Sequence, residues 1–363
     1  MMNLDLGKEI LFGLKIFPTT RYQGSKRRLL PWLYQIFNNI EFESVLDGFG
    51  GSASTSYLFK LMGKKVHFND ILNSNYQTGM ALIENDFVTL GNKDIEYLLT
   101  SSDTQFPSFI KDTFEDIYYY PKENLWLDMM VFNIKNLSQI YKDDVLRKKQ
   151  ALAFHSLFQA CLTKRPFNLF HRKNLYLRKA DVPRAFNNKK TWDIEFPQLF
   201  QKYALEISSK VFTNNQKNEA SCNDLLLLMD NNYDLVYLDP PYQRPSEIHP
   251  IDYFSLYHFL EGLVDYDNWY SRIDYSKKHR PLQKMLSKYD DLSPLVRLKL
   301  ILEKYNESKI AISYGDPGKP TIDEIKELLS YYKKNINVFD INYSYKLNKR
   351  NGNNLREVLI IGS

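Results

Sequence analysis

The chain has 363 residues, enough for one large domain with an insertion or for two domains, and 44% hydrophobic residues support a well-filled core. Its net charge of +5 permits a polyanionic partner without requiring one, and its two cysteines exclude a disulfide framework or a metal-binding cysteine quartet. The N-terminus lacks a signal-peptide pattern and no apolar run reaches the roughly 20 residues of a membrane span, so we expect a cytoplasmic protein without a membrane partner.

The first informative stretch is residues 19–37, where a glycine-serine turn and basic residues precede an apolar helix. Tyr22 offers an aromatic ring and Lys26 a positive charge beside this turn, so both are candidates for ligand contact. An ordinary helix N-cap by Ser25, followed by solvated basic side chains, is an equally good interpretation of this stretch taken alone.

A strand-turn-helix pattern follows at 44–61, with Asp47 and Gly50 in a glycine-rich turn. Glycines let the backbone approach a ligand closely, but the spacing matches neither the dinucleotide-binding GxGxxG motif nor a P-loop. The next strand ends at Asp70, roughly 20 residues later, where an acid commonly binds ribose hydroxyls. Helix capping is the alternative for Asp70, yet turn and acid together favour a nucleoside-containing cofactor.

Residues 75–205 have mainly helical patterns and contain a segment in which basic and aromatic residues alternate. Cations interleaved with aromatic rings suit a phosphate backbone with stacking at bases. A solvated basic face over a small aromatic core is the alternative interpretation. The predicted nucleic-acid contacts are Lys164, Arg165, Arg172, Lys173 and Arg178.

The strand pattern returns at 210–213, and Asp224 lies at a later strand-to-helix turn, either as a helix cap or as a ligand contact. The most informative stretch is 235–242, an apolar strand followed by Asp239, two prolines and Tyr242. Because proline cannot donate to a sheet ladder, the strand must stop at Asp239. Ligands of open α/β sheets bind outside the carboxyl ends of the strands, so this turn is predicted to lie at a ligand site.

The C-terminal part is predicted to contain a strand at 309–314 and a helix that starts at Thr321 with Glu324 in capping-box spacing. The last residues, 336–363, have the pattern of two strands around a polar loop, so we expect a doubly wound α/β sheet finished by an antiparallel hairpin. His258 and Glu261 are three residues apart on a predicted helix, which does not make a metal site, and we interpret them as structural.

Three motifs, taken in order, resemble those of the Dam-like DNA adenine-N6 methyltransferases. They are Arg-Tyr-Gln-Gly-Ser-Lys at 21–26, Asp-Gly-Phe-Gly-Gly at 47–51 and Asp-Pro-Pro-Tyr at 239–242. The order resembles the alpha group, in which the target-recognition region lies between the cofactor motifs and the catalytic motif. The resemblance implies a Rossmann-like S-adenosylmethionine-dependent methyltransferase sheet with an inserted, mainly helical recognition domain. The implied divisions are 1–74 and 206–363 for the catalytic domain and 75–205 for the insertion.

The resemblance also assigns roles to individual residues. The expected cofactor contacts, for S-adenosylmethionine and without a metal, are Tyr22, Lys26, Asp47, Gly50, Asp70, Asp224 and Asp239. Asp239 and the Pro240 carbonyl would accept hydrogen bonds from the adenine amine, while Tyr242 would stack on a base flipped out of the duplex. Ser25 departs from the family pattern because it replaces a usual glycine. Double-stranded DNA is the expected substrate, and a cognate restriction endonuclease is a candidate partner.

Other activities stay open at this point. An N4-cytosine methyltransferase poses the same chemical problem, but that subclass more often has serine in place of Asp239. RNA and protein-glutamine methyltransferases usually begin the Pro-Pro-Tyr turn with asparagine. A catalytically inactive DNA-binding module on the same fold is the alternative from another class, and the presence of Tyr22, Lys26, Asp70 and Asp239 together argues against it.

Overall fold

The computed structural model describes residues 2–101, 105–180, 188–229, 232–243, 251–284, 287, 289–342 and 356–363. Within these residues, seven strands form one sheet in the order β3-β2-β1-β4-β5-β7-β6. The strands are β1 Ser44–Asp47, β2 Lys65–Asp70, β3 Glu219–Cys222, β4 Leu235–Leu238, β5 Lys309–Asp316, β6 Ile336–Asn342 and β7 Arg356–Gly362. Strands β1 to β5 are parallel, and β7 runs antiparallel between β5 and β6. The chain therefore has a mixed α/β architecture with a mostly parallel sheet.

The central strand, β4, shows how both faces of the sheet are covered. Every residue of β4 is buried, as expected for a parallel strand with layers on both sides. Because side chains alternate along a strand, Leu235 and Tyr237 join one hydrophobic cluster while Val236 and Leu238 join the other. The larger cluster lies under α2 Leu30–Phe37 and α3 Ser54–Leu61, and the smaller one under α13 Pro294–Lys304 and α14 Ile322–Ser330.

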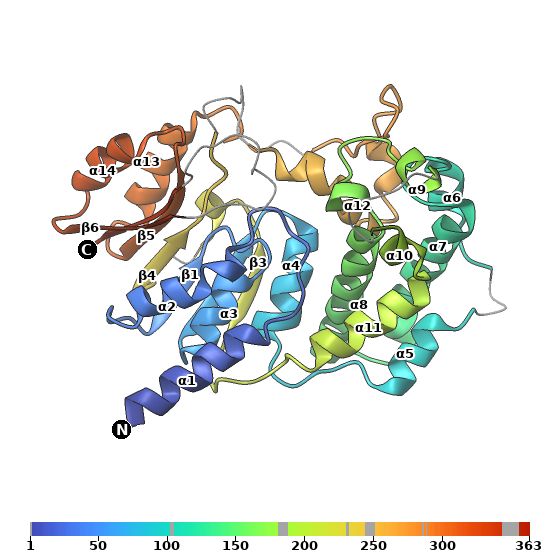
Figure 1. Ribbon diagram of the computed structural model, residues 1–363, viewed down its shortest axis with the longest axis horizontal. Coiled ribbons are helices and arrows are strands. Elements are labelled where there is room, and N and C mark those ends of the chain that lie inside the picture. The colour runs from blue at the N-terminus through green and yellow to red at the C-terminus, as the bar shows by residue number, and fades with distance from the viewer. Residues whose placement is uncertain are drawn as a thin grey trace.

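The first helices after the N-terminus and after β2 flank this sheet. They are α1 Met2–Lys15 and α4 Asn73–Gly79, the latter continued by a short π-helical turn, η2 Met80–Glu84. A helical region lies beyond them, on the right of Figure 1 and away from β5, β6 and α14. Its helices are α5 Asn92–Leu99, α6 Phe109–Thr113, α7 Pro121–Asn136, α8 Asp143–Thr163, α9 Tyr176–Lys179, α10 Asn188–Asp193, α11 Phe196–Ser208 and α12 Tyr253–Val264.

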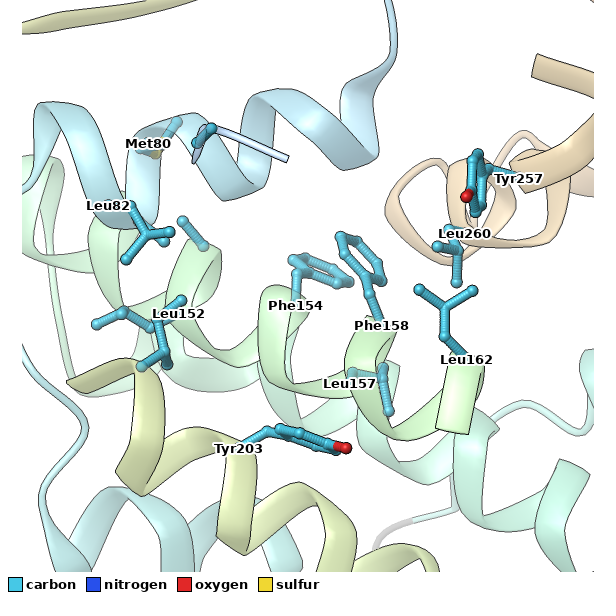
Figure 2. Packing of buried hydrophobic residues seen from close by; sticks show 14 of the residues in the cluster. Met80, Leu82, Leu152, Phe154, Leu157, Phe158, Leu162, Tyr203, Tyr257 and Leu260 are labelled. Atoms are coloured by element: carbon cyan, nitrogen blue, oxygen red, sulfur yellow. The ribbon is translucent and has the colours of Figure 1, made fainter. Parts of the chain in front are cut away.

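Helix α8 is the centre of the helical region. Its residues from Ala151 to Thr163 are buried on every side of the helix, so this part of α8 is a core helix, whereas the first turns carry exposed side chains. Figure 2 shows Phe154 and Phe158 on one side of α8, which Leu260 of α12 also faces, and Leu157 on the opposite side, toward Tyr203 of α11. These residues belong to the same apolar cluster as the sheet residues Val45 and Phe68, so the helical region and the sheet share one core.

Two predictions about local structure have clear outcomes. The expected capping box of α14 is confirmed, because the Thr321 side chain and the Glu324 carboxylate cap each other's backbone N–H groups. The strand expected at 210–213 is wrong, because these residues have no regular structure and β3 lies later, at Glu219–Cys222. Val211 and Phe212 instead pack as loop residues on the core, with the Lys60 ammonium 4.9 Å from the Phe212 ring centre. The polar loop expected between the last two strands lies outside the described residues.

No helix in the described part of the chain is long and apolar enough to cross a membrane. The same residues contain no group of three or more acidic, histidine or cysteine side chains with a metal-binding arrangement. His258 is buried, with its Nε2 atom 2.9 Å from the Tyr118 hydroxyl, and Glu261 accepts the first backbone N–H groups of α4.

Candidate active site

A cavity of about 420 Å³ opens at the carboxyl ends of β1, β2 and β4. Strand order reverses at β1, which lies between β2 and β4, and such switch points create a crevice in open α/β sheets. Eight predicted cofactor or catalytic residues line this one cavity: Tyr22, Lys26, Asp47, Gly50, Asp70, Asp224, Asp239 and Pro240. The motifs are far apart in sequence and meet here because the strands that deliver them are parallel neighbours.

Asp47, the last residue of β1, lines the cavity and has one buried carboxylate oxygen without a hydrogen-bond partner among the described residues. Its Oδ2 atom accepts a 2.6 Å hydrogen bond from the Ser56 hydroxyl, while Oδ1 is buried and has no hydrogen-bond partner among the described residues. Burial raises the pKa of this carboxyl to about 7, and the nearby Asp239 and Asp70 charges add to the effect while the Ser56 hydrogen bond opposes it. Such an orphaned acceptor favours a cationic ligand group beside it.

The glycine-rich turn after β1 has a shape that only glycine allows at Gly50. A Cβ atom there would lie 2.1 Å from the Phe68 ring, so any side chain would force the turn away from β2. The next residue, Gly51, donates its backbone N–H to Asp70 Oδ2 at 2.8 Å. The turn is thus fixed against the end of the neighbouring strand, close to the cavity.

Asp70 lines the cavity, and its carboxylate accepts backbone N–H groups. Its Oδ1 atom accepts a 2.8 Å hydrogen bond from the backbone N–H of Leu72, the residue before α4. Leu72 is the N-cap of α4 and no side chain caps this helix, so the interpretation of Asp70 as a helix cap is wrong. Each carboxylate oxygen can accept a further hydrogen bond, so these contacts do not exclude a ligand hydroxyl. Burial raises the pKa of the Asp70 carboxyl above its ordinary value.

Tyr22 is the middle ring of a stack of three tyrosines. Its ring centre lies 5.6 Å from that of Tyr253 and 4.9 Å from that of Tyr257, with interplanar angles of 5° and 11°. The Tyr257 hydroxyl accepts the backbone N–H of Gln23 at 2.7 Å, and the Tyr22 hydroxyl accepts a hydrogen bond from Asn75. The stack joins the first motif to the start of α12. Tyr253 and Tyr257 were not recognised in the sequence, although their spacing of four places both rings on one helix face.

Asp239 follows β4 directly and is held by a buried lysine. The Lys26 ammonium lies 2.8 Å from Asp239 Oδ1 and 2.8 Å from Oε1 of Glu357 on β7. Lys26, predicted as a cofactor contact, therefore forms an ion pair with Asp239, the predicted catalytic acid. Burial raises the pKa of Asp239 to about 6, which the Lys26 charge opposes and the Glu357 charge reinforces. Glu357 was not recognised in the sequence, and a single acid before an apolar strand gave no signal for it.

Pro240 lines the cavity beside Asp239, whereas Tyr242 is not among the lining residues. The Tyr242 ring lies 5.0 Å from the ring centre of Tyr314 on β5. Its hydroxyl lies so close to Gly315 that a Cβ atom there would be 2.2 Å away. The turn is further tied down by the backbone pair between Gln243 and Lys319.

Asp224 is the N-cap of the short helix Leu225–Leu227, so the capping interpretation that the sequence left open is correct. Its other oxygen, Oδ2, accepts hydrogen bonds from Arg297 at 2.8 Å and from the Ser287 hydroxyl at 2.9 Å. The side chain is 6% exposed and lines the cavity, so most of its acceptor capacity is already used within the protein.

A comparison with family descriptions decides what this arrangement belongs to. Residues 22–309 match the D12 class N6 adenine-specific DNA methyltransferase family. The chain belongs to this family. It is therefore an adenine-specific DNA methyltransferase, with DNA as substrate and, as for methyltransferases of this kind in general, S-adenosylmethionine as methyl donor. The chain is also 26% identical over 359 residues to the Type II methyltransferase M2.HphI of Haemophilus parahaemolyticus, covering 95% of this chain and 97% of that relative.

Three of the five cations expected to contact DNA are internal in the methyltransferase. Lys164 and Arg165 are 1% exposed and Arg178 is 5% exposed. Lys164 and Arg178 share the buried Glu123 carboxylate, each at 2.8 Å. The structure thus corrects the expectation that these three side chains present charge on the surface. Their acidic partner lies dozens of residues away in sequence, and local composition did not reveal the pairing.

Arg165 organises the loop that carries the two exposed cations. Its guanidinium donates to the backbone carbonyls of Leu169 and Arg172 and lies 4.5 Å from the ring centre of Tyr118. Arg172 and Lys173 are exposed at the end of this loop. The loop is anchored on α12, because Phe170 donates its backbone N–H to the Leu256 carbonyl at 2.9 Å.

Phe167 is an exposed aromatic residue on the same loop. Its side chain is 66% exposed, and its backbone has a φ of 65°, a left-handed conformation that is costly for a bulky residue. The Arg172 guanidinium lies 5.8 Å from the Phe167 ring centre. The Phe167 ring and the Arg172 guanidinium are therefore neighbours on the surface of a loop that is anchored on α12.

Proposed function

We propose that the cavity at the ends of β1, β2 and β4 holds S-adenosylmethionine together with an adenine flipped out of the duplex. The observation that carries this assignment is the meeting, in one cavity of about 420 Å³, of the orphaned Asp47 oxygen, the Asp70 carboxylate and the Lys26–Asp239 pair. When bound, the cofactor supplies a methyl group activated by a positively charged sulfur. Asp47 would hold its amino group, and Asp70 its ribose hydroxyls.

The adenine amine would be held by Asp239 and the Pro240 carbonyl. This amine is a poor nucleophile because its lone pair is delocalised into the ring. Two acceptors on its two N–H groups favour a pyramidal nitrogen with the lone pair directed at the methyl carbon. Positioning and electrostatics carry such a displacement, so no strong base is needed. Asp239, with a pKa of about 6, is also suited to receive the proton that the methylated nitrogen loses.

Tyr242 is proposed to stack on the flipped base. A base engaged in pairing cannot reach the cavity, so it must leave the duplex, and an aromatic face stabilises it outside. Packing against Tyr314 and the close approach to Gly315 hold the Tyr242 ring in a fixed place beside the catalytic turn. This rigidity supports its role as a wall of the base site, although the ring does not line the cofactor cavity itself.

Residues 75–205 of the helical region are proposed as the target-recognition part, within the division 1–74, 75–205 and 206–363, while α12 belongs to the C-terminal part of the catalytic domain. The proposed DNA contacts of the target-recognition part are Arg172 and Lys173, with Phe167 as an exposed ring for the bases. Lys164, Arg165 and Arg178 are instead proposed to support this loop from inside the protein. Lys164 and Arg178 form ion pairs with Glu123, and Arg165 donates to the Arg172 backbone carbonyl. A contact between Asp224 and the cofactor is also proposed, through the small part of the Asp224 side chain that stays exposed.

We further propose that the enzyme works in a restriction-modification system beside a cognate endonuclease. Its likeness to a Type II methyltransferase over nearly the whole of both chains supports this.

Incubation with DNA and radiolabelled S-adenosylmethionine, followed by digestion to nucleosides, tests the catalytic assignment. The wild-type protein should place the label on N6 of adenine. Asp239→Ala should abolish transfer while weakening cofactor binding much less in a direct titration. Asp323→Ala, an acid 92% exposed on α14, is the matched control and should keep full activity. Equal loss of binding and transfer in Asp239→Ala would contradict the role given to Asp239.

A further inference from the structure

We propose that Glu357 is a positioning residue for methyl transfer: it fixes Lys26 on Asp239 and keeps a net negative charge beside the adenine amine. This inference rests on the proposed role of Asp239 and extends it. The family match ends at residue 309, so neither Glu357 nor its partner Ser313 lies in the matched part of the chain.

The three charges form a continuous chain. The Lys26 ammonium lies 2.8 Å from Asp239 Oδ1 on one side and 2.8 Å from Glu357 Oε1 on the other. The Ser313 hydroxyl donates to the same Glu357 oxygen at 3.0 Å. Exposed fractions fall from 20% for Asp239 to 5% for Lys26 and 2% for Glu357. Asp239 and Lys26 line the cavity whereas Glu357 does not, so Glu357 acts on substrate through Lys26.

Packing alone does not account for an acid at this position. Strand β7 lies between two strands, and its residues from Glu357 to Gly362 are buried. A carboxylate in such a place costs several kcal/mol unless it is paired, and an apolar residue of similar size is often the more stable choice. Glu357 is paired, and its cationic partner is the lysine that binds the catalytic acid. The role of Glu357 is therefore to set the net charge of the site.

The net charge of the three groups suits the reaction. Two carboxylates and one ammonium sum to one negative charge beside the amine. During transfer, the carbon–sulfur bond breaks as the carbon–nitrogen bond forms, and positive charge moves from sulfur to N6 until N6 releases a proton. A fixed negative charge close to N6 stabilises that arriving positive charge. Without Glu357, Lys26 would neutralise Asp239 and remove this effect.

The proposal also predicts a change in pH dependence. Within the described part of the chain, the charged and titratable groups facing Asp239 are Lys26, Glu357, Asp47, Tyr253 and Tyr237. Glu357 raises the pKa of Asp239, so its neutralisation lowers that pKa. The fall of kcat at acidic pH, which reports protonation of Asp239, must then move to lower pH in a Glu357→Gln variant.

The test compares Glu357→Gln with Glu327→Gln, an exposed acid on α14, from about pH 5 to about pH 9. We expect Glu357→Gln to lower kcat by on the order of tenfold to a hundredfold and to move its acidic limb to lower pH. The affinity for S-adenosylmethionine, measured by titration, should change by less than about threefold. The Glu327→Gln control should match wild type in all three.

A folded Glu357→Gln enzyme with wild-type kcat and an unmoved acidic limb would overturn the inference. If this variant fails to fold, Ser313→Ala decides, because it removes the hydroxyl without unpairing a charge. It should lower kcat about threefold at constant KM, and an unchanged kcat would overturn the inference as well. Activity surviving in Asp239→Ala would instead refute the underlying catalytic assignment. An inactive Asp239→Ala with an unaffected Glu357→Gln refutes the role of Glu357 alone.

Discussion

Glu123 and Arg178 form a two-point ion pair inside the helical region, with Nη1–Oε2 and Nη2–Oε1 both at 2.8 Å. The Lys164 ammonium adds a third contact, 2.8 Å from Oε1. One buried carboxylate thus pairs with two cations that the sequence had suggested for DNA. The pair joins α7 to α9, so the packing of these two helices depends on the Glu123 carboxylate.

Glu123→Gln should lower the free energy of unfolding by about 3–5 kcal/mol, because two buried cations would share no carboxylate. Urea unfolding measures this, with Glu195→Gln as a control, since Glu195 is 56% exposed and pairs with Lys122. Burial raises the pKa of Glu123, but Arg178 and Lys164 outweigh it and lower the pKa overall. The stabilisation is therefore present above the ordinary glutamate pKa and is lost as pH falls through the lowered one. A loss below about 1 kcal/mol at neutral pH would speak against the pairing.

Asp47→Asn should stabilise the protein while weakening cofactor binding. The carboxyl has a pKa of about 7, above its unfolded value, so ionisation destabilises the fold as pH rises through about 7. Removing the charge should raise the free energy of unfolding by about 1–3 kcal/mol at about pH 8 and have little effect at about pH 4. Thermal unfolding at both pH values measures the change in stability, and titration with S-adenosylmethionine measures the change in cofactor binding. Equal stability changes at both pH values would show that the charge is not the cause.

Arg172→Ala and Lys173→Ala should each weaken DNA binding and reduce the slope of log affinity against log salt by about one. Binding titrations at several salt concentrations measure this slope. Lys326→Ala, on α14 and away from the helical region, should leave the slope unchanged. Lys164→Ala should reduce stability without altering the slope, because the Lys164 ammonium is buried in an ion pair with Glu123. An unchanged slope for both loop variants would place residues 172 and 173 away from DNA.

The tyrosine stack should matter to cofactor binding through its rings. Tyr253→Phe keeps a ring beside Tyr22 and should bind S-adenosylmethionine nearly as wild type does. Tyr253→Ala removes a cavity wall and should weaken binding by about tenfold. Tyr257→Phe leaves the Gln23 N–H without its acceptor and should cost about 1–2 kcal/mol of stability. Fluorescence titration and urea unfolding separate these effects, and equal binding by both Tyr253 variants would exclude a role for the ring.

The part of the site that could be predicted is the part encoded locally. β4 ends at Leu238, just before Asp239 and the two prolines, while the glycine turn follows β1 and Asp70 is the last residue of β2. Parallel strands then bring these ends together without further information. The same local logic predicted the cap at Thr321, which is confirmed.

The rest depended on contacts between distant segments. Glu357 reaches Lys26 only because β7 runs between β5 and β6, and no local pattern specifies that register. Lys164 looked like a surface cation because its partner Glu123 belongs to another helix. The strand expected at 210–213 failed because a short apolar run packs equally well as a loop, and Val211 does so here.

The link from Lys26 to Glu357 also has a consequence for biosynthesis. A growing chain contains Lys26 and Asp239 long before Glu357, and β7 must enter between β5 and β6 after both of those strands exist. The charge cluster of Asp239, Lys26 and Glu357 is therefore completed only after residue 357 has been made. With the role proposed for Glu357, a nascent chain that has not yet reached this residue should be a poor catalyst, even after the glycine-rich turn and the Asp-Pro-Pro-Tyr turn have emerged.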